Sequence, residues 1–307
     1  MSAVALVGVT ASGKSELAHQ VALRRGDVEI VSIDSMCVYR GMDLGTSKPT
    51  AVARAQVAYH LLDLVDPGTE FGLADFQKAA RAALDDIDAR GRQALLVGGT
   101  GLYLRSVVDD LRIPGRYPEV AAALEAELDE GRATVGELHR RLVALDPVGA
   151  GRMDPGNRRR IVRALEVTMG SGQPFSAFGP GLEAYPPAAC TMIGLSIEPD
   201  VVDLRVATRF AGFMEAGLLN EVRALAARPG GMSRTARQAL GYRELLAHVE
   251  DGVPLDACVE EAVRRTRTLA RRQSAWFRRD PRIEWIEPGA GVVERVDRAL
   301  GAYGRSR

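Results

Sequence analysis

The residues best suited to chemistry lie near the start of the chain, in the run Gly8-Val9-Thr10-Ala11-Ser12-Gly13-Lys14-Ser15. The pattern Gly-x-x-x-x-Gly-Lys-Ser is typical of a phosphate-binding loop, because its glycines let backbone amides curl around phosphate oxygens. Lys14 supplies a positive charge, and Ser15 supplies a hydroxyl that can hold a magnesium ion. Three of the forty basic residues are lysines, and the wide guanidinium of arginine does not fit inside such a curl. The loop therefore predicts a site for linked phosphates.

Such a loop needs a strand before it and a helix after it, and the sequence offers both. The apolar run 3–7 predicts a buried strand, and residues 16–22 have the composition of a helix. A second, β-branched run, 28–33, ends at Asp34 and Ser35. Strand ends of an open parallel sheet face the ligand crevice, so Asp34 should point at the phosphate site. A carboxylate there can bind magnesium or accept a proton from a nucleophile, and spacing alone does not decide between these roles.

The remaining segments predict an α/β protein with a P-loop NTPase-like core, a mostly parallel sheet flanked by helices, and an all-helical insertion domain. In the insertion, helix follows helix: one begins at Pro118, one at the capping box Thr134–Glu137, and one spans 157–169. We expect a core of residues 1–115 and 188–307 and an insertion domain of residues 116–187. Further core strands are expected at 60–65, 94–97, 191–197 and 283–286, and further core helices from 73 to Gly91 and over 201–216, 218–227 and 255–279.

Composition narrows the class of protein. The 307 residues include forty acidic and forty basic side chains, so a nucleic-acid partner would have to bind a local patch. Three separate cysteines and four histidines give neither a disulfide framework nor a zinc site, which fits a reducing compartment. No basic leader precedes the first apolar run, and no run has the length of a membrane span. We therefore expect a cytoplasmic protein without a membrane partner, and a monomer.

Seven motifs follow one another along nearly the whole chain: the phosphate loop 8–15, Asp34-Ser35-Met36-Cys37-Val38-Tyr39, Gly45-Thr46-Ser47-Lys48-Pro49, Gly98-Gly99-Thr100-Gly101-Leu102-Tyr103, Arg163-Ala164-Leu165-Glu166, Leu240-Gly241-Tyr242-Arg243 and Arg271-Arg272-Gln273-Ser274-Ala275-Trp276-Phe277-Arg278. Together they resemble the motifs of bacterial tRNA dimethylallyltransferases, the tRNA isopentenyltransferase family. The resemblance implies that the loop binds the diphosphate of dimethylallyl diphosphate with Mg²⁺, rather than a nucleotide. It also implies transfer of the dimethylallyl group to N6 of the adenosine immediately 3′ of the anticodon, in tRNAs reading codons that begin with U, with release of diphosphate.

The resemblance also implies a role for individual residues. Asp34 matches the general base that accepts the N6 proton. Thr10 and Arg209 would stabilise the leaving diphosphate, together with the loop amides, Lys14 and magnesium at Ser15. The target base must leave its stack to be reached. The residues expected to bind the tRNA anticodon stem-loop are Asp34, Ser35, Met36, Cys37, Thr100 (which would line the channel to the base), Arg158, Arg159, Arg160, Arg163, Gln238, Gly241, Tyr242, Arg243, Arg271 and Arg272.

Two positions depart from the family pattern. Val9 stands where proline is usual, which restores a backbone N–H and should have little effect. Cys37 stands where glutamine is usual, in the segment that reads the base, so a polar contact to tRNA is lost or replaced there. Bland alternatives stay open for other residues: the arginine groups also fit solvated helix faces, Arg209 fits a structural ion pair, and Asp34 fits a magnesium ligand.

Two other functions are compatible with parts of the sequence. One is a small-molecule kinase that uses ATP, but the later strand runs into Gly98-Gly99-Thr100 without the acidic residue that usually holds magnesium in such enzymes. The other is a tRNA-binding module with a vestigial loop, which the intact Lys14, Ser15 and Asp34 disfavour. Consumption of ATP without tRNA would support the kinase.

Overall fold

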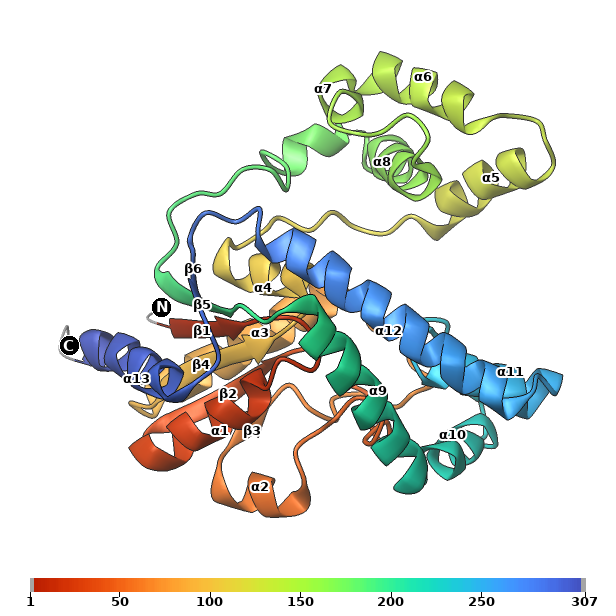
Figure 1. Cartoon of the computed structure of the whole chain (residues 1–307). Coiled ribbons are helices and arrows are strands. Elements are labelled where there is room, and N and C mark those ends of the chain that lie inside the picture. Colours follow the sequence, from red (N-terminus) through yellow and green to blue (C-terminus); the bar gives the residue numbers. More distant parts are fainter. Residues whose placement is uncertain (1–2, 305–307) are drawn as a thin grey trace. The chain divides into compact units, whose positions relative to one another are not determined.

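The computed structural model describes residues 3–304 and contains a six-stranded sheet in the order β3-β2-β4-β1-β5-β6 (Figure 1). Each pairing between these strands is parallel. Strands covered on both faces should be almost wholly apolar, and all five residues of β1 are buried. The predicted fold class is thus confirmed. The strands are β1 (Ala3–Val7), β2 (Val28–Ile33), β3 (Tyr59–His60), β4 (Gln93–Gly98), β5 (Cys190–Leu195) and β6 (Ile283–Ile286).

The register of the central strands brings their carboxyl ends to one edge. Val7 of β1 lies opposite Gly98 of β4, and Gly98 lies opposite Ile33 of β2. The chain therefore leaves the sheet at the same level in three places: into the phosphate loop, into Asp34, and into Gly99. Gly98 has to be glycine, because a Cβ there would lie 2.0 Å from the carbonyl oxygen of Ile33.

Helices cover the two faces of the sheet, and β1 shows how the sequence divides between them. Val4 and Leu6 pack in one apolar cluster with α1 (Lys14–Arg25) and α13 (Ala290–Gly304), whereas Ala3, Ala5 and Val7 pack in another. The period of two sends alternate side chains to opposite faces. The second cluster includes residues of α3 (Leu73–Ala89), α4 (Gly101–Val108), α9 (Pro199–Glu215), α10 (Leu218–Ala226), α11 (Tyr242–Asp251) and α12 (Leu255–Phe277).

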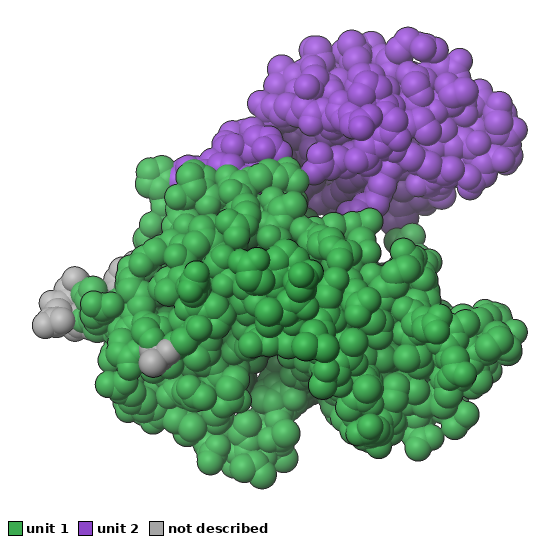
Figure 2. All heavy atoms as spheres, viewed as in Figure 1, with its two compact units in different colours: residues 1–109, 187–307 green, residues 110–186 purple. Residues whose placement is uncertain are grey.

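Residues 110–186 form a second compact unit, shown in purple in Figure 2, while residues 3–109 and 187–304 form the first. The second unit has its own core, in which Leu124, Leu142 and Leu165 are at most 1% exposed. Pro118 occupies the first turn of its first helix, and the capping box of Thr134 and Glu137 is present. Its helices are α5 (Pro118–Asp129), α6 (Val135–Leu145), α7 (Pro147–Ala150) and α8 (Arg158–Ser171).

The strand expected over 60–65 is wrong beyond its first residue. β3 ends at His60, and Leu61 and Asp63 have φ angles of 64° and 55°. A strand cannot continue through such left-handed residues. The turn carries the Asp63 carboxylate to within 2.5 Å of Lys48 Nζ, and one oxygen also accepts from Arg54 at 2.6 Å. Tertiary ion pairing has overridden the apolar pattern of the segment.

His60, the last residue of β3, is half-buried, and its Nε2 lies 2.7 Å from Oε2 of Glu29. A short helix, α2 (Ala51–Gln56), lies between β2 and β3. Within residues 3–304, no helix combines the length and the apolar character needed to cross a membrane.

Candidate functional site

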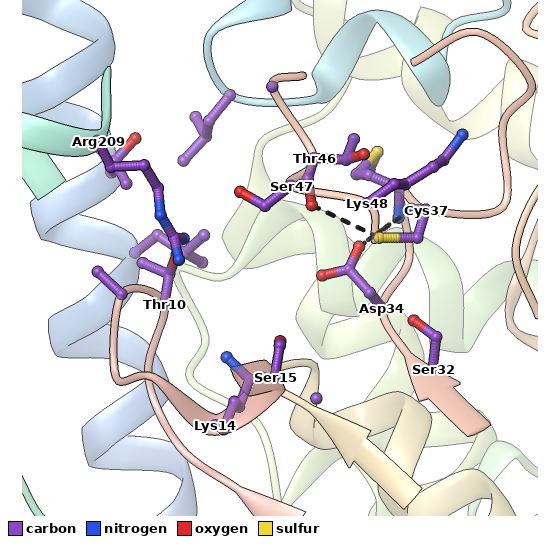
Figure 3. Close-up of a pocket in the computed structure, with 18 of the residues that line it drawn as sticks. Thr10, Lys14, Ser15, Ser32, Asp34, Cys37, Thr46, Ser47, Lys48 and Arg209 are labelled. Carbon is purple, nitrogen blue, oxygen red and sulfur yellow. Dashed lines mark hydrogen bonds between the residues drawn. The ribbon is translucent and has the colours of Figure 1, made fainter. Parts of the chain in front are cut away.

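A cavity of about 1020 Å³ lies at the carboxyl edge of the sheet, within the first unit (Figure 3). The phosphate loop, the end of β4 and the segment that follows β2 form its floor. Residues of α9 and α12 line it from the other side. Segments that are far apart in sequence thus meet because parallel strands end at one edge. Of the predicted site residues, the cavity lining includes Thr10, Ala11, Ser12, Gly13, Lys14, Ser15, Asp34, Ser35, Met36, Cys37, Arg209, Gln238, Arg243 and Arg272.

The phosphate loop has the backbone that its glycines suggest. Gly13 has a φ of 85° and caps the N-terminus of α1 without a side chain, which leaves the amides of the first turn directed toward the cavity. Ala11 also has a positive φ, of 60°. Alternation of this kind forms a concave nest of N–H groups that suits an anion. Ser12 is 1% exposed, and its hydroxyl has no hydrogen-bond partner among the described residues.

Two loop amides are already engaged. The backbone N–H of Ser12 donates to the carbonyl of Val9 at 3.3 Å. The backbone N–H of Thr10 donates to Oε1 of Gln273 on α12 at 2.8 Å. Thr10 can therefore offer a phosphate its hydroxyl but not, in this conformation, its N–H. The loop motif gave no sign of this bond, since sequence spacing cannot show a partner 263 residues away.

The pKa of Lys14 depends on its burial and on two charged residues of the site, Asp34 and Arg209. Burial lowers its pKa to about 8, the Asp34 carboxylate opposes this shift, and the Arg209 guanidinium adds to it. Its Nζ donates to the carbonyl of Val9 at 3.2 Å. Ser15, the next residue, is exposed to the cavity. A buried ammonium with one neutral partner is well placed to bind an incoming anion.

Asp34 is held by its own backbone. Its Oδ1 accepts the N–H of Met36 at 2.7 Å and that of Cys37 at 3.2 Å, which forms an Asx turn directly after β2. Oδ2 has no hydrogen-bond partner among residues 3–304. Figure 3 shows the carboxylate in the cavity, above Lys14 and Ser15. One oxygen fixes the side chain, so the other remains available to a ligand or a proton.

Cys37 is 6% exposed, and its Sγ lies 3.6 Å from the carbonyl oxygen of Thr46. Burial raises the pKa of its thiol well above the usual value. The backbone N–H of Cys37 still supports Asp34. The departure from glutamine therefore leaves the Asp34 turn intact and changes only the side chain beside it.

The segment 41–49, which borders the cavity, is supported from beneath by two buried polar residues. The Lys48 side chain is 1% exposed, and its Nζ bonds to the Tyr39 carbonyl at 2.5 Å and to Asp43 at 2.8 Å. Tyr242 accepts from the Gly45 N–H at 3.2 Å and donates to Glu221 at 2.5 Å. Lys48 and Tyr242 are thus parts of the scaffold.

Four of the predicted tRNA contacts in the first unit are not part of the cavity lining. Gly241 and Tyr242 are buried, so this placement offers neither to a tRNA. Arg271 is exposed but donates to Asp203 at 2.7 Å, and it does not line the cavity. Thr100 caps the N-terminus of α4 beside the cavity floor, without being part of its lining.

The four predicted arginines of α8 belong to the second unit. Arg158 pairs with Glu125 and Asp129, and Arg163 donates to Glu166 at 2.7 Å and to the Pro114 carbonyl at 2.9 Å. Arg158 thus joins α8 to α5, and Arg163 joins α8 to the segment that precedes α5. Arg159 and Arg160 are exposed, and their tRNA role stays a prediction.

Sequence reasoning assigned no role to several residues that line the cavity. Gln273, Arg264, Arg265 and Thr46 are among them. Gln273 lies inside the terminal motif 271–278, where one glutamine among arginines and aromatics was the available signal. Arg264 and Arg265 both pair with Glu261, so their spacing alone resembled a solvated helix face.

Comparisons with known proteins show which family the chain belongs to. The IPP transferase family model matches residues 37–280. A tRNA dimethylallyltransferase of Streptomyces coelicolor is 44% identical over 294 residues, covering 96% of this chain and 92% of that protein. One of Thermobifida fusca is 45% identical over 302 residues, covering 97% and 92%. The chain belongs to the IPP transferase family.

Solved structures agree with this assignment. The tRNA isopentenylpyrophosphate transferase of Bacillus halodurans superposes with a TM-score of 0.70 at 33% identity, covering 99% of this chain and 97% of that one. A eukaryotic dimethylallyltransferase acting on tRNA gives a TM-score of 0.74 at 25% identity, covering 93% and 73%. The resemblance read from the seven motifs is thus confirmed at the level of family and fold.

Proposed function

We propose that the chain is a tRNA dimethylallyltransferase. It transfers the dimethylallyl group of dimethylallyl diphosphate to N6 of the adenosine 3′-adjacent to the anticodon, in tRNAs reading codons that begin with U. The observation that carries the proposal is the shared cavity of Asp34 and the phosphate loop in a chain of the IPP transferase family. A proton acceptor and a diphosphate site in one cavity are what this substitution requires.

The diphosphate binds in the nest of the loop. Its charge is met by the α1 N-terminus, the Lys14 ammonium and the Arg209 guanidinium, which lines the same cavity. The Ser12 hydroxyl, buried without a partner, becomes satisfied by a phosphate oxygen. As the allylic carbon–oxygen bond breaks, these groups and the Thr10 hydroxyl stabilise the charge that collects on the leaving diphosphate.

Magnesium fits the donors that are present. The Ser15 hydroxyl and the diphosphate oxygens are hard oxygen ligands of the kind that Mg²⁺ prefers. No cluster of three or more His, Cys, Asp or Glu side chains suited to a metal occurs within residues 3–304, which agrees with an ion held mainly by its diphosphate. When bound, it would neutralise part of the diphosphate charge.

Asp34 acts as the general base. The exocyclic amine of adenosine is a weak nucleophile, and the bond from N6 to the allylic carbon forms as the bond from that carbon to diphosphate breaks. The N6 proton passes to the free Oδ2 of Asp34, while Oδ1 stays bonded to Met36 and Cys37. The products are dimethylallyl adenosine and diphosphate.

The tRNA approaches through local positive charge, because the chain as a whole is neutral. Arg243, Arg264 and Arg272 line the cavity beside Lys14 and Arg209. They would bind the phosphates around the extruded adenosine. We further propose that the protein acts as a monomer in the cytoplasm.

The test is a transfer assay with purified protein, magnesium and an unmodified tRNA that reads UNN codons and carries the target adenosine. Dimethylallyl diphosphate should yield a nucleoside heavier by one C5H8 unit and an equal amount of diphosphate. An anticodon arm without that adenosine is the matched control and should yield neither.

The same assay with ATP distinguishes the alternatives. The loop can hold the linked phosphates of ATP, but no second strand ends in the acidic residue that usually holds magnesium in enzymes that use ATP. ATP should therefore not be consumed. Consumption of ATP with unmodified tRNA would establish a kinase instead. Binding of tRNA without either reaction would indicate a module with a vestigial loop.

A further inference from the structure

Gln273, a glutamine of α12, lies in the floor of the cavity. Its carboxamide oxygen accepts the Thr10 N–H at 2.8 Å. Its other end faces β4: a Cβ on Gly99 would lie 2.6 Å from Gln273 Nε2. The same Cβ would lie 3.1 Å from the carbonyl oxygen of Gly8. The Gln273 side chain thus fills the space between the phosphate loop and the end of β4, which only a glycine at position 99 leaves open.

The next turn of the helix contributes a second contact of the same kind. Trp276 lies three residues after Gln273, on the same face of α12. A Cβ on Gly101 would lie 2.1 Å from the indole Nε1 of Trp276. Gln273 and Trp276 therefore seat α12 on the Gly99–Gly101 turn, while the neighbouring Arg272 faces the cavity.

We propose that Gln273 is a positioning residue for the transfer reaction: it fixes the Thr10 backbone and thereby aims the Thr10 hydroxyl at the leaving diphosphate. The inference rests on the proposed function. Thr10 follows Val9, where the loop leaves the sheet and has no proline to restrict its backbone. The bond to Gln273 supplies a restraint from outside the loop. Because the same helix carries Arg264 and Arg272, the bond also joins the nucleic-acid side of the cavity to the diphosphate side.

A double-mutant cycle tests this assignment. Gln273→Met keeps the length of the side chain but removes the acceptor. Misplacement of a catalytic group by about 1 Å can cost on the order of a hundredfold, so kcat should fall about ten- to hundredfold while the tRNA KM changes little. In a Thr10→Ala background, which lacks the hydroxyl, Gln273→Met should change kcat by about twofold at most.

A second variant disturbs the hydrogen bond between Thr10 and Gln273 from the end of β4. Gly99→Ala should displace the Gln273 carboxamide, because the atom at 2.6 Å is the end of a flexible side chain, whereas the Gly8 carbonyl oxygen at 3.1 Å has to give by only a few tenths of an ångström. It should reproduce the kcat loss of Gln273→Met, and the two losses should not multiply. Ser274→Ala, on the same helix but outside the cavity lining, is the matched control and should behave as the unmodified protein does. Thermal unfolding of each variant identifies any that fail to fold.

The cycle is repeated on the affinity for dimethylallyl thiolodiphosphate, a non-reactive analogue, so that it does not depend on turnover. If the unmodified protein binds the analogue but transfers nothing, the proposed function fails and the binding cycle still decides the role of Gln273. Multiplying effects of Gln273→Met and Thr10→Ala, on kcat and on affinity, would show that Gln273 only packs. So would a Gln273→Met variant with unchanged kcat.

Discussion

Binding of the diphosphate should draw a proton onto Lys14, and this can be measured without any chemistry taking place. In the free protein, burial lowers the pKa of Lys14 to about 8 from the usual 10.5. A bound diphosphate places negative charge beside the ammonium and raises that pKa again. The sign follows: below pH 8 the lysine is already charged, and above it the ligand has to bring a proton with it.

The magnitude follows from the size of the shift. At pH 7 about nine-tenths of the free protein carries the charged lysine, and at pH 9 about one-tenth does. The affinity for dimethylallyl thiolodiphosphate should therefore fall about tenfold between these pH values. At pH 8.5, where about a quarter of Lys14 is protonated, each bound ligand should take up about 0.75 proton.

Isothermal titration calorimetry in buffers of different ionisation enthalpy measures this uptake directly. Lys14→Arg is the control, because its guanidinium stays charged at every pH used; it should bind more weakly and take up no proton at pH 8.5. Lack of uptake by the unmodified protein at pH 8.5, or equal uptake by Lys14→Arg, would refute the reasoning.

Three further predictions concern the base, the tRNA contacts and a buried ion pair. Asp34→Asn should lower kcat by about a hundredfold or more with little change in diphosphate affinity; a large loss of affinity with altered magnesium dependence would make it a metal ligand. Arg272→Ala should flatten the log–log salt slope of tRNA binding by about 0.7–0.9, and Arg271→Ala, whose guanidinium already pairs with Asp203, should flatten it less; slopes equal to that of the unmodified protein in both variants would mean that neither arginine touches phosphate. Arg90 and its neighbours lower the pKa of Glu29 to about 2, so this ion pair stabilises the fold above pH 4.5 and its contribution is lost as the pH falls toward 2; urea unfolding at pH 7 and pH 3 should show part of this loss, and Glu29→Gln should remove it.

Local sequence was sufficient wherever a pattern and its structural cause lie in the same segment. The phosphate loop, the parallel strands and the capping box of Thr134 and Glu137 depend on neighbours a few residues apart, and each was predicted. The segment 60–65 failed because its conformation depends on ion pairs of Asp63 with Lys48 and Arg54. Residue type alone gives no sign that an aspartate in an apolar run has such partners.

The same distinction, between features set by nearby residues and features set by distant partners, applies to the residues of the candidate site. Asp34 was found because the end of a strand predicts its direction, whereas the role of Tyr242 was misjudged because its partners, Gly45 and Glu221, lie 197 and 21 residues away in sequence. Gln273 was missed for the same reason. Motif resemblance identified all of these positions but could not separate a residue that touches a ligand from one that supports the residue that does.

The glycines of the motifs show how much of the site depends on backbones that come close together. A Cβ at Gly98 would strike the Ile33 carbonyl of the neighbouring strand, and one at Gly99 would strike the Gln273 carboxamide. At Gly8, the Cβ would lie 3.0 Å from the unpaired Ser12 hydroxyl. These groups can approach the strand ends so closely only because the residues at positions 8, 98 and 99 have no Cβ. The glycines at these strand ends therefore set the distance between Asp34 and the phosphate loop, while the side chains set the chemistry.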